Sequence, residues 1–176
     1  VGDHTRCIRS EEGFNVYKLQ QHCKEHKNLS EYPYGETIDK DDFFSIDCFC
    51  VIRAAKELVI TGDSGNKLNC KLIVEAANGP IDMESENIIL DKGIEIIPDI
   101  LANSGGVIVS YYEWLQNKRS EYWPEKIVLE KLSELMKETF TSVYTHHKQE
   151  NISLRNACFI KSIKKISEII KRKKLF

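Results

Sequence analysis

Apolar residues gather in three short, nearly unbroken runs within the first hundred residues of the chain. The runs are residues 46–52 (IDCFCVI), 71–76 (KLIVEA) and 94–97 (IEII). Runs of this length and composition are typical of strands that are buried on both faces of a sheet, as in parallel sheets. The pattern therefore predicts three buried strands.

Around these runs the apolar positions change to helical spacing. Residues 13–26 carry Val16, Leu19 and Cys23 at intervals of three and four, and residues 81–93 (IDMESENIILDKG) begin with an acidic turn and end at Gly93. Pro80 stands just before this second segment, close to where a helix accepts proline. Alternating strands and helices predict an α/β fold with a doubly wound, parallel, Rossmann-like sheet.

After about residue 115 the strand-like runs stop and two long amphipathic segments follow. Residues 124–147 and 153–173 each carry one apolar stripe at intervals of three, four and seven, and Ser153 is a suitable N-cap for the second. The basic residues at 171–174 suit the C-terminal end of a helix. We therefore expect an α/β part over residues 1–115 and a helical part over residues 116–176.

The composition is that of an ordinary globular domain. The 176 residues include 25 Lys+Arg and 27 Asp+Glu, giving a net charge of −2, and 41% are hydrophobic. This balance disfavours a disordered chain and a nucleic-acid-binding module. No apolar run is long enough for a membrane span and no signal peptide opens the sequence. Nucleic acid and membrane are therefore not expected partners.

Six cysteines are scattered along the chain without Cys-x-x-Cys spacing. No histidine follows them at an interval typical of zinc sites, so no metal site is expected. Scattered cysteines without a signal peptide are typical of reduced thiols in a cytoplasmic protein. An organelle would require a transit peptide upstream of Val1.

Candidate chemistry should lie just after the strands, because ligands bind outside the carboxyl ends of strands in open parallel sheets. If Val1 ends a strand, Asp3 lies at such an end and its carboxylate could accept hydrogen bonds from the ribose hydroxyls of an adenosine. The alternative is a surface aspartate in a turn. After the run KLIV, Asn78 offers both a donor and an acceptor to a ligand, or it caps a tight turn at Gly79.

The third place is the segment 98–107 (PDILANSGGV), followed by a predicted helix. Paired glycines at 105 and 106 would let a ring or backbone approach closely, and the first turn of the helix offers free N–H groups to a carboxylate. Ser110, one turn further on, could donate its hydroxyl to the same anion. The alternative is a purely structural glycine bend with Ser110 on an ordinary helix face.

Taken in order, the motifs KLIVEAANGP, IIPDILANSGGVIVSYYEW and LRNA resemble the C-terminal half of a glutamate dehydrogenase of the glutamate/leucine/phenylalanine/valine dehydrogenase family. The resemblance spans nearly the whole chain. It implies oxidative deamination of L-glutamate to 2-oxoglutarate and ammonium, with hydride transfer to NAD or NADP. It also implies a homo-oligomer, a hexamer.

The resemblance also implies six ligand contacts. They are cofactor contacts at Asp3, near the adenosine ribose, at Ala55 and Asn78 in the cofactor cleft and at Asn103 near the nicotinamide, and substrate contacts at Val107 and Ser110, the latter with a carboxylate. Hydride transfer requires close apposition of the ring and the substrate carbon, so polar groups that fix both partners suit this chemistry. Residues 1–115 would then be a partial dinucleotide-binding domain.

The chain also departs from the family pattern. It contains no G-x-G-x-x-G loop, and the family's catalytic lysine and aspartate have no counterpart in it. We therefore expect the first strand and the phosphate loop to precede Val1, no catalytic residue in this chain, and no turnover by it alone. Arg53 replaces a usual proline and could accommodate a 2′-phosphate, whereas Asp3 favours NAD. NAD is the favoured cofactor.

Two other functions remain open at this point. One is a related dehydrogenase that acts on branched-chain or aromatic amino acids, although the turns AANGP and SYYEW differ from those enzymes. The other is a non-catalytic or split paralog that serves as a nucleotide-binding or assembly subunit, which the missing phosphate loop would explain.

Overall fold

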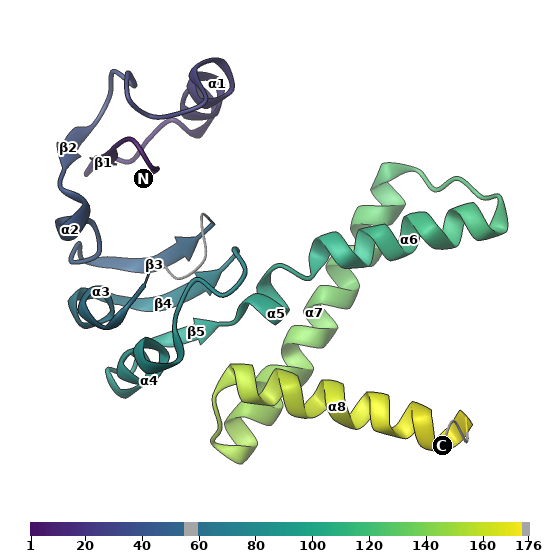
Figure 1. Ribbon diagram of the computed structural model, residues 1–176. Coiled ribbons are helices and arrows are strands. Elements are labelled where there is room, and N and C mark those ends of the chain that lie inside the picture. The colour runs from purple at the N-terminus through teal and green to yellow at the C-terminus, as the bar shows by residue number, and fades with distance from the viewer. Residues whose placement is uncertain (55–59, 174–176) are drawn as a thin grey trace. The chain divides into compact units, whose positions relative to one another are not determined.

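The computed structural model describes residues 1–54 and 60–173, and its elements follow the order shown in Figure 1. The strands are β1 (Cys7–Arg9), β2 (Glu36–Ile38), β3 (Cys48–Arg53), β4 (Cys70–Glu75) and β5 (Glu95–Ile97). The helices are α1 (Val16–His26), α2 (Lys40–Phe43), α3 (Gly62–Lys67), α4 (Met83–Asp91), α5 (Asp99–Ala102), α6 (Gly105–Arg119), α7 (Glu125–Glu150) and α8 (Leu154–Lys173).

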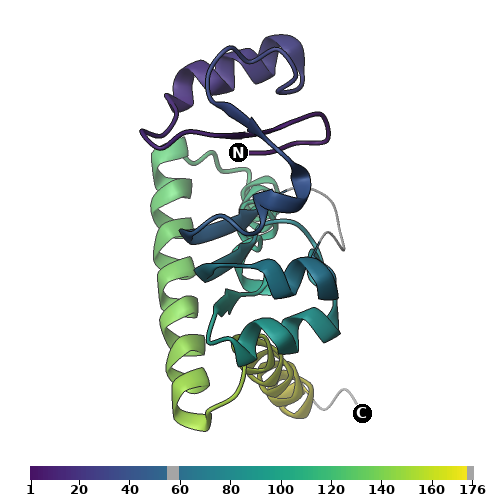
Figure 2. The same cartoon turned by 90° about the vertical axis from the view of Figure 1, so that its left-hand side faces the viewer.

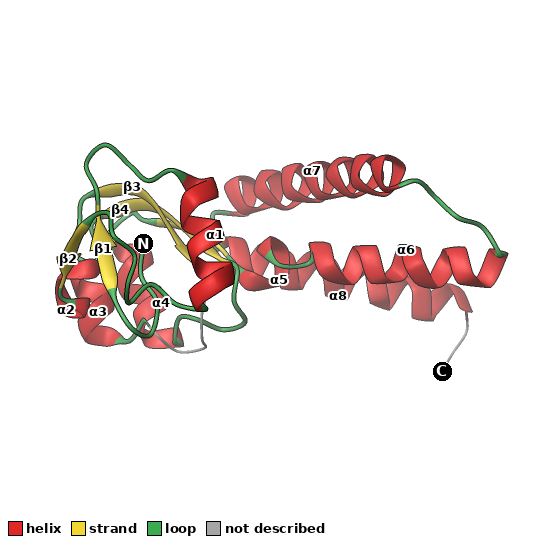
Figure 3. Cartoon of the chain, turned by 90° about the horizontal axis from the view of Figure 1, so that it is seen from above, coloured by secondary structure: helices red, strands yellow, loops and turns green. Residues whose placement is uncertain are grey.

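The three predicted strands form one sheet with the order β3-β4-β5. Strands β4 and β5 run parallel, with Leu72 opposite Glu95 and Val74 opposite Ile97. Each strand lies within two residues of its predicted bounds, which is the usual uncertainty at element ends. From α5 onward the described chain contains helices and no strand (Figure 3). The predicted α/β class with a parallel sheet and C-terminal helices is confirmed.

Caps fix where the predicted helices begin. Helix α1 starts at Val16 and not at Gly13, because the Asn15 side chain accepts a hydrogen bond from the N–H of Lys18. Helix α4 starts after Asp82, whose side chain accepts from the N–H of Ser85, so Pro80 lies two residues before the cap.

The predicted start of α8 and the predicted end of α4 are also as expected. The hydroxyl of Ser153 accepts a hydrogen bond from the N–H of Asn156, which confirms Ser153 as the cap. Gly93 follows α4 with a φ of 77°, a left-handed conformation that glycine adopts without strain.

The chain divides into two compact units. The first comprises Val1–Val51, Leu58–Lys71 and Ile81–Ile94, and the second comprises Ile52–Glu57, Leu72–Pro80 and Glu95–Phe176. The predicted boundary between residues 115 and 116, which separates a cofactor-binding part from a helical part, stays a prediction.

The first unit contains an antiparallel pair that the sequence pattern did not predict. Strands β1 and β2 pair with Cys7 opposite Ile38, and Val1 exchanges hydrogen bonds with Ile8 without belonging to either strand. Ile8 of β1 forms a buried cluster with Leu29 and Tyr32. Helices α3 and α4 of the same unit pack against each other.

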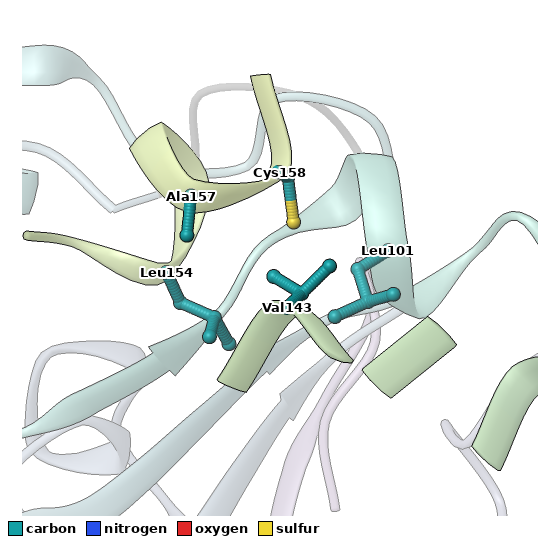
Figure 4. Packing of buried hydrophobic residues seen from close by; sticks show 5 residues of the cluster. All are labelled: Leu101, Val143, Leu154, Ala157 and Cys158. Carbon is teal, nitrogen blue, oxygen red and sulfur yellow. The ribbon is translucent and has the colours of Figure 1, made fainter. Parts of the chain in front are cut away.

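The second unit is built on its helices. Helix α7 is one uninterrupted helix (Figure 2) that packs against both α6 and α8, and α8 also contacts α5 and β5. At the centre of these contacts, side chains from α5, α7 and α8 converge (Figure 4). The cluster consists of Leu101, Val143, Leu154, Ala157 and Cys158. It fixes the start of α8 beside the end of β5.

No helix within residues 1–54 and 60–173 is long and apolar enough to cross a membrane.

Candidate functional site

A buried carboxylate ends strand β4. Successive side chains of β4 point to opposite faces of the sheet, so Ile73 and Glu75, two residues apart, lie on one face, and both are buried. Glu75 is 0% exposed, and its Oε2 accepts hydrogen bonds from the backbone N–H of Asp99 and from the side chain of Arg155. A buried carboxylate needs such partners, because leaving it unpaired is costly.

Arg155 joins two carboxylates from different strand ends. Its Nη2 lies 2.7 Å from Oε2 of Glu75 and its Nη1 lies 2.8 Å from Oδ1 of Asp99. The arginine side chain is 20% exposed and that of Asp99 is 22% exposed. A planar guanidinium can hold both acceptors at once, and charge-assisted hydrogen bonds of this kind are among the strongest in proteins. We call Glu75, Asp99 and Arg155 the Arg155 cluster.

Burial and hydrogen bonding shift the pKa values of Glu75 and Asp99 in opposite directions. Burial raises the pKa of Glu75, and the hydrogen bonds from Asp99 and Arg155 only partly offset this. Burial would also raise the pKa of Asp99, but donation from the N–H groups of Gly79 and Ile100 and from Arg155 outweighs it and lowers that pKa. Asp99 is therefore the more strongly stabilised anion.

Asp99 connects the turn after β4 to the turn after β5. Its Oδ2 accepts a hydrogen bond of 2.9 Å from the N–H of Gly79, and its own N–H reaches Glu75. Gly79 has a φ of 49°, in the region that favours glycine, so the chain turns sharply there. The two turns are thus held at the same edge of the sheet.

Two predicted site residues meet at this edge. Nδ2 of Asn103 lies 2.7 Å from Oδ1 of Asn78, so the two side-chain amides pair with each other. Asn103 is the C-cap of α5 and Asn78 lies in the turn after β4. Both side chains lie just after strands of the sheet, and their role in ligand binding stays a prediction. We call Asn78 and Asn103 the amide pair.

The two residues predicted to contact the substrate lie on the first turns of α6. The helix begins at Gly105, as predicted, and Val107 and Ser110 are exposed, with Val107 at 75%. A side chain added at Gly106 would meet no atom of the described chain within 4 Å. Packing within the described residues therefore does not explain why glycine occupies this position.

Asp3 lies in the first unit and organises its own turn. Its Oδ1 accepts hydrogen bonds from the N–H and hydroxyl of Thr5 and from the N–H of Arg6, and its Oδ2 accepts from the N–H of Leu29. Partial burial alone would raise the pKa of Asp3, but these four hydrogen bonds lower it to about 2. Asp3 is therefore an aspartate in a turn, which was the alternative that the sequence left open. Ribose binding by Asp3 stays a prediction.

Ala55 lies outside the described residues. Just before it, Arg53 ends β3 with 9% exposure, and its carbonyl accepts a hydrogen bond from the N–H of Ala77. The end of β3 therefore lies beside the turn that carries Asn78.

The sequence did not predict the Arg155 cluster, although each of its residues stands next to apolar positions. Glu75 follows the apolar run KLIV, Asp99 precedes Ile100 and Leu101, and Arg155 interrupts the apolar face of α8. A charged residue inside an apolar run is unusual unless it has a partner. Each of these three residues was therefore a candidate for a partly buried ion pair.

The cysteines are free thiols. Cys7 and Cys158 are buried and the other four are half-buried. Within the described ranges, His, Cys, Asp and Glu residues form no group of three or more that could hold a metal ion.

Comparison with known proteins identifies the relatives of this chain. A family model described as Glutamate/Leucine/Phenylalanine/Valine dehydrogenase matches residues 1–173. The NAD-specific glutamate dehydrogenase of Clostridioides difficile is 38% identical over 164 residues, which are 93% of this chain and 39% of the relative. The glutamate dehydrogenase of Thermotoga maritima is 35% identical over 176 residues, which are 100% of this chain and 42% of the relative.

A solved structure agrees with this relationship. The crystal structure of glutamate dehydrogenase from Peptoniphilus asaccharolyticus superposes with a TM-score of 0.78 at 34% identity, covering 95% of this chain and 37% of that one. The chain thus spans about two fifths of the length of the relatives that it matches. With a family match over residues 1–173 and an α/β fold shared with solved glutamate dehydrogenases, this chain belongs to the glutamate/leucine/phenylalanine/valine dehydrogenase family.

Proposed function

We propose that this chain is part of an NAD-dependent glutamate dehydrogenase and binds the nicotinamide end of the cofactor at the amide pair. The observation that carries the proposal is the 2.7 Å contact between Asn103 and Asn78 at the carboxyl ends of β4 and β5. Open α/β sheets bind their ligands at this edge.

The amide pair is complementary to a carboxamide. Each asparagine side chain has one carbonyl and one NH₂ group, and the mutual hydrogen bond uses one of each. One NH₂ group and one carbonyl remain on the pair, whichever way round the two amides are assigned. The carboxamide of nicotinamide also presents one carbonyl and one NH₂ group, so the residues present fit this cofactor. NAD, when bound, accepts the hydride.

Substrate binding is proposed for the beginning of α6. The hydroxyl of Ser110 would donate to a carboxylate of glutamate, and Val107 would contact its aliphatic part. Support comes from the exposure of both side chains and from the open space at Gly106, which leaves the backbone accessible. The first N–H groups of α6 add partial positive charge that suits an anion.

NAD is proposed over NADP. Relatives from Clostridioides difficile and Peptoniphilus asaccharolyticus carry the name NAD-specific glutamate dehydrogenase. In the proposed complex the carboxylate of Asp3 lies near the adenosine ribose, where it would repel a 2′-phosphate. Ala55 remains a proposed contact in the cofactor cleft. Arg53 is buried, which limits its access to a cofactor phosphate.

The proposed assembly is a homo-oligomer, a hexamer by family resemblance, and the proposed compartment is the cytoplasm. Six free thiols, two of them buried, suit a reducing compartment. No acid or base for the deamination is assigned within this chain.

The test is NAD-dependent oxidation of L-glutamate by the full-length protein, followed through the absorbance of NADH, with wild type and Ser110→Ala compared. Loss of one hydroxyl donor to a carboxylate costs about 1.5–3 kcal/mol, so we expect the KM for glutamate to rise roughly 10- to 100-fold. Ser142→Ala, at an exposed serine of α7, is the matched control and should leave KM unchanged.

Two outcomes would contradict the proposal. Preferential oxidation of leucine, valine or phenylalanine would favour a related amino-acid dehydrogenase. Binding of NADH without turnover of any of these amino acids would favour a non-catalytic subunit.

A further inference from the structure

We propose that Arg155 is a positioning residue for the amide pair, acting from the first turn of α8 through Glu75 and Asp99. This inference rests on the proposed function, because it concerns how tightly the nicotinamide half of the cofactor is held. It assigns a role in binding the nicotinamide half of the cofactor to helix α8, which contributes no residue to the predicted ligand contacts.

The first link runs from Arg155 to Asn78. Nη1 of Arg155 donates to Oδ1 of Asp99, and Oδ2 of the same carboxylate accepts from the N–H of Gly79. Gly79 follows Asn78 directly in the chain. The orientation of one carboxylate therefore sets the position of the turn that presents Asn78.

The second link runs from Arg155 to Asn103. Asp99 is the first residue of α5, and its backbone carbonyl accepts a hydrogen bond of 3.0 Å from the N–H of Asn103. Helix α5 has only four residues, and so short a helix has little stability of its own. Its position depends on contacts with the rest of the unit, which include Leu101 in the apolar cluster and the hydrogen bonds of Asp99.

The third link holds the cluster itself in place. Oε2 of Glu75 accepts both from Nη2 of Arg155 and from the N–H of Asp99, so the two acids are fixed relative to each other. Oε1 of Glu75 is buried and has no hydrogen-bond partner among the described residues, so Oε2 is the atom that anchors the cluster. Two acceptors at 2.7 and 2.8 Å match the two N–H groups of a guanidinium, whereas a lysine ammonium has no planar fork to hold them.

The start of α8 is a firm base for this side chain. Leu154, Ala157 and Cys158, which flank Arg155 in sequence, are buried in the cluster of Figure 4. A helix start that is anchored by these buried side chains restricts how far the guanidinium can move. Loss of the fork should therefore loosen the amide pair more than it loosens α8.

The effect should be confined to one half of the cofactor. The amide pair is proposed to contact the nicotinamide, while Asp3 is proposed to contact the adenosine ribose. The described donors to the Asp3 carboxylate, from Thr5, Arg6 and Leu29, all belong to the first unit. A change at Arg155 should thus weaken binding of NADH without weakening binding of ADP-ribose, which lacks the nicotinamide.

The experiment is calorimetric titration of the full-length protein with NADH and with ADP-ribose. Arg155→Lys keeps the charge but not the planar fork, and we expect NADH to bind at least about tenfold more weakly, with ADP-ribose changed less than about twofold. Glu75→Gln, a second variant that keeps the side-chain volume, should show the same selective loss at about threefold.

Lys148→Met is the matched control. Lys148 lies 2.8 Å from Glu95 in a half-exposed ion pair of the same unit, and this pair includes no residue of the Arg155 cluster or of the amide pair. Its removal should leave the affinities for both ligands unchanged.

Each outcome decides between specific possibilities. Equal weakening of NADH and ADP-ribose, no weakening of either, or failure of both Arg155→Lys and Glu75→Gln to fold would overturn the positioning role. Wild-type protein that binds ADP-ribose but not NADH would overturn the proposed function and this inference with it.

Discussion

Two acidic sites in this protein satisfy their carboxylates in opposite ways. Asp3, in the first unit, accepts hydrogen bonds from Thr5, Arg6 and Leu29, so its partners are chiefly backbone N–H groups, most of them nearby in sequence. Glu75, in the second unit, is fully buried and depends on Asp99 and Arg155, 24 and 80 residues away.

The difference shows in the titration of the two acids. Hydrogen bonds from its turn lower the pKa of Asp3 to about 2, whereas burial raises the pKa of Glu75 despite an arginine at 2.7 Å. A carboxylate at a partly hydrated turn is stabilised as an anion by local donors. A fully buried one remains costly, so it depends strongly on a single cationic partner.

The largest expected effect is on folding stability after loss of Arg155. Arg155→Met would leave Glu75 buried and Asp99 half-buried without their shared cation, and removing one partner of a buried pair costs about 3–5 kcal/mol. We expect the free energy of unfolding in urea to fall by about 3 kcal/mol. Lys148→Met, which breaks a half-exposed pair, should lower this free energy much less. Equal losses for the two variants would contradict the contrast between buried and exposed pairs.

A smaller loss is expected at the local turn. Asp3→Ala removes the carboxylate that accepts four hydrogen bonds. The donors lie at a partly exposed turn, so water can take the place of the carboxylate as their acceptor. We expect a loss of about 2 kcal/mol in the free energy of unfolding. Asp39→Ala is a suitable control, because Asp39 caps α2 without a side-chain hydrogen bond and should cost less than about 0.5 kcal/mol. A loss above that of Arg155→Met would reverse the order of the two sites.

The smallest effect is on the pH dependence of stability. Because the pKa of Asp3 is lowered from 3.8 to about 2, its contribution is present above about pH 4 and is lost as the pH falls toward 2. Asp3→Asn should therefore flatten the fall in unfolding free energy between about pH 5 and pH 2.5, by about 1 kcal/mol after solvent screening.

Glu75 provides the contrast in the same experiment. Because the pKa of Glu75 is raised, its contribution to the free energy of unfolding depends on pH in the opposite way. This contribution is present at low pH and declines as the pH rises through the folded-state pKa. Glu75→Gln should leave the loss of stability below about pH 4 in place. If Glu75→Gln flattened the fall in unfolding free energy at low pH as Asp3→Asn does, Asp3 would not be the group responsible for that fall.

The sequence predicted the elements whose signal is local. Apolar runs located β3, β4 and β5, stripes located α7 and α8, and Ser153 was identified as a cap, because each depends on residues adjacent in the chain or one turn apart. The pair β1 and β2 was missed because its strands have three residues each and lie far apart in sequence. Runs this short carry no detectable period.

The site was predictable to the same extent. Asn78 and Asn103 each follow a strand, so the rule for parallel sheets was sufficient to bring them to one edge. The cluster behind them was not predicted, because Glu75, Asp99 and Arg155 come from three elements and meet only through side chains. Nothing in the spacing of these three residues indicates that one guanidinium serves both acids.

The 80-residue separation between Glu75 and Arg155 also has a consequence for the order of assembly during synthesis. A chain made from its N-terminus presents Glu75 long before Arg155 exists, and closing so long a loop carries an entropic cost that delays such contacts. Until α8 is made and docks, the Glu75 carboxylate must stay hydrated or take up a proton. The turns that carry Asn78 and Asn103 would therefore reach their final arrangement only after Arg155 has been made and α8 has docked.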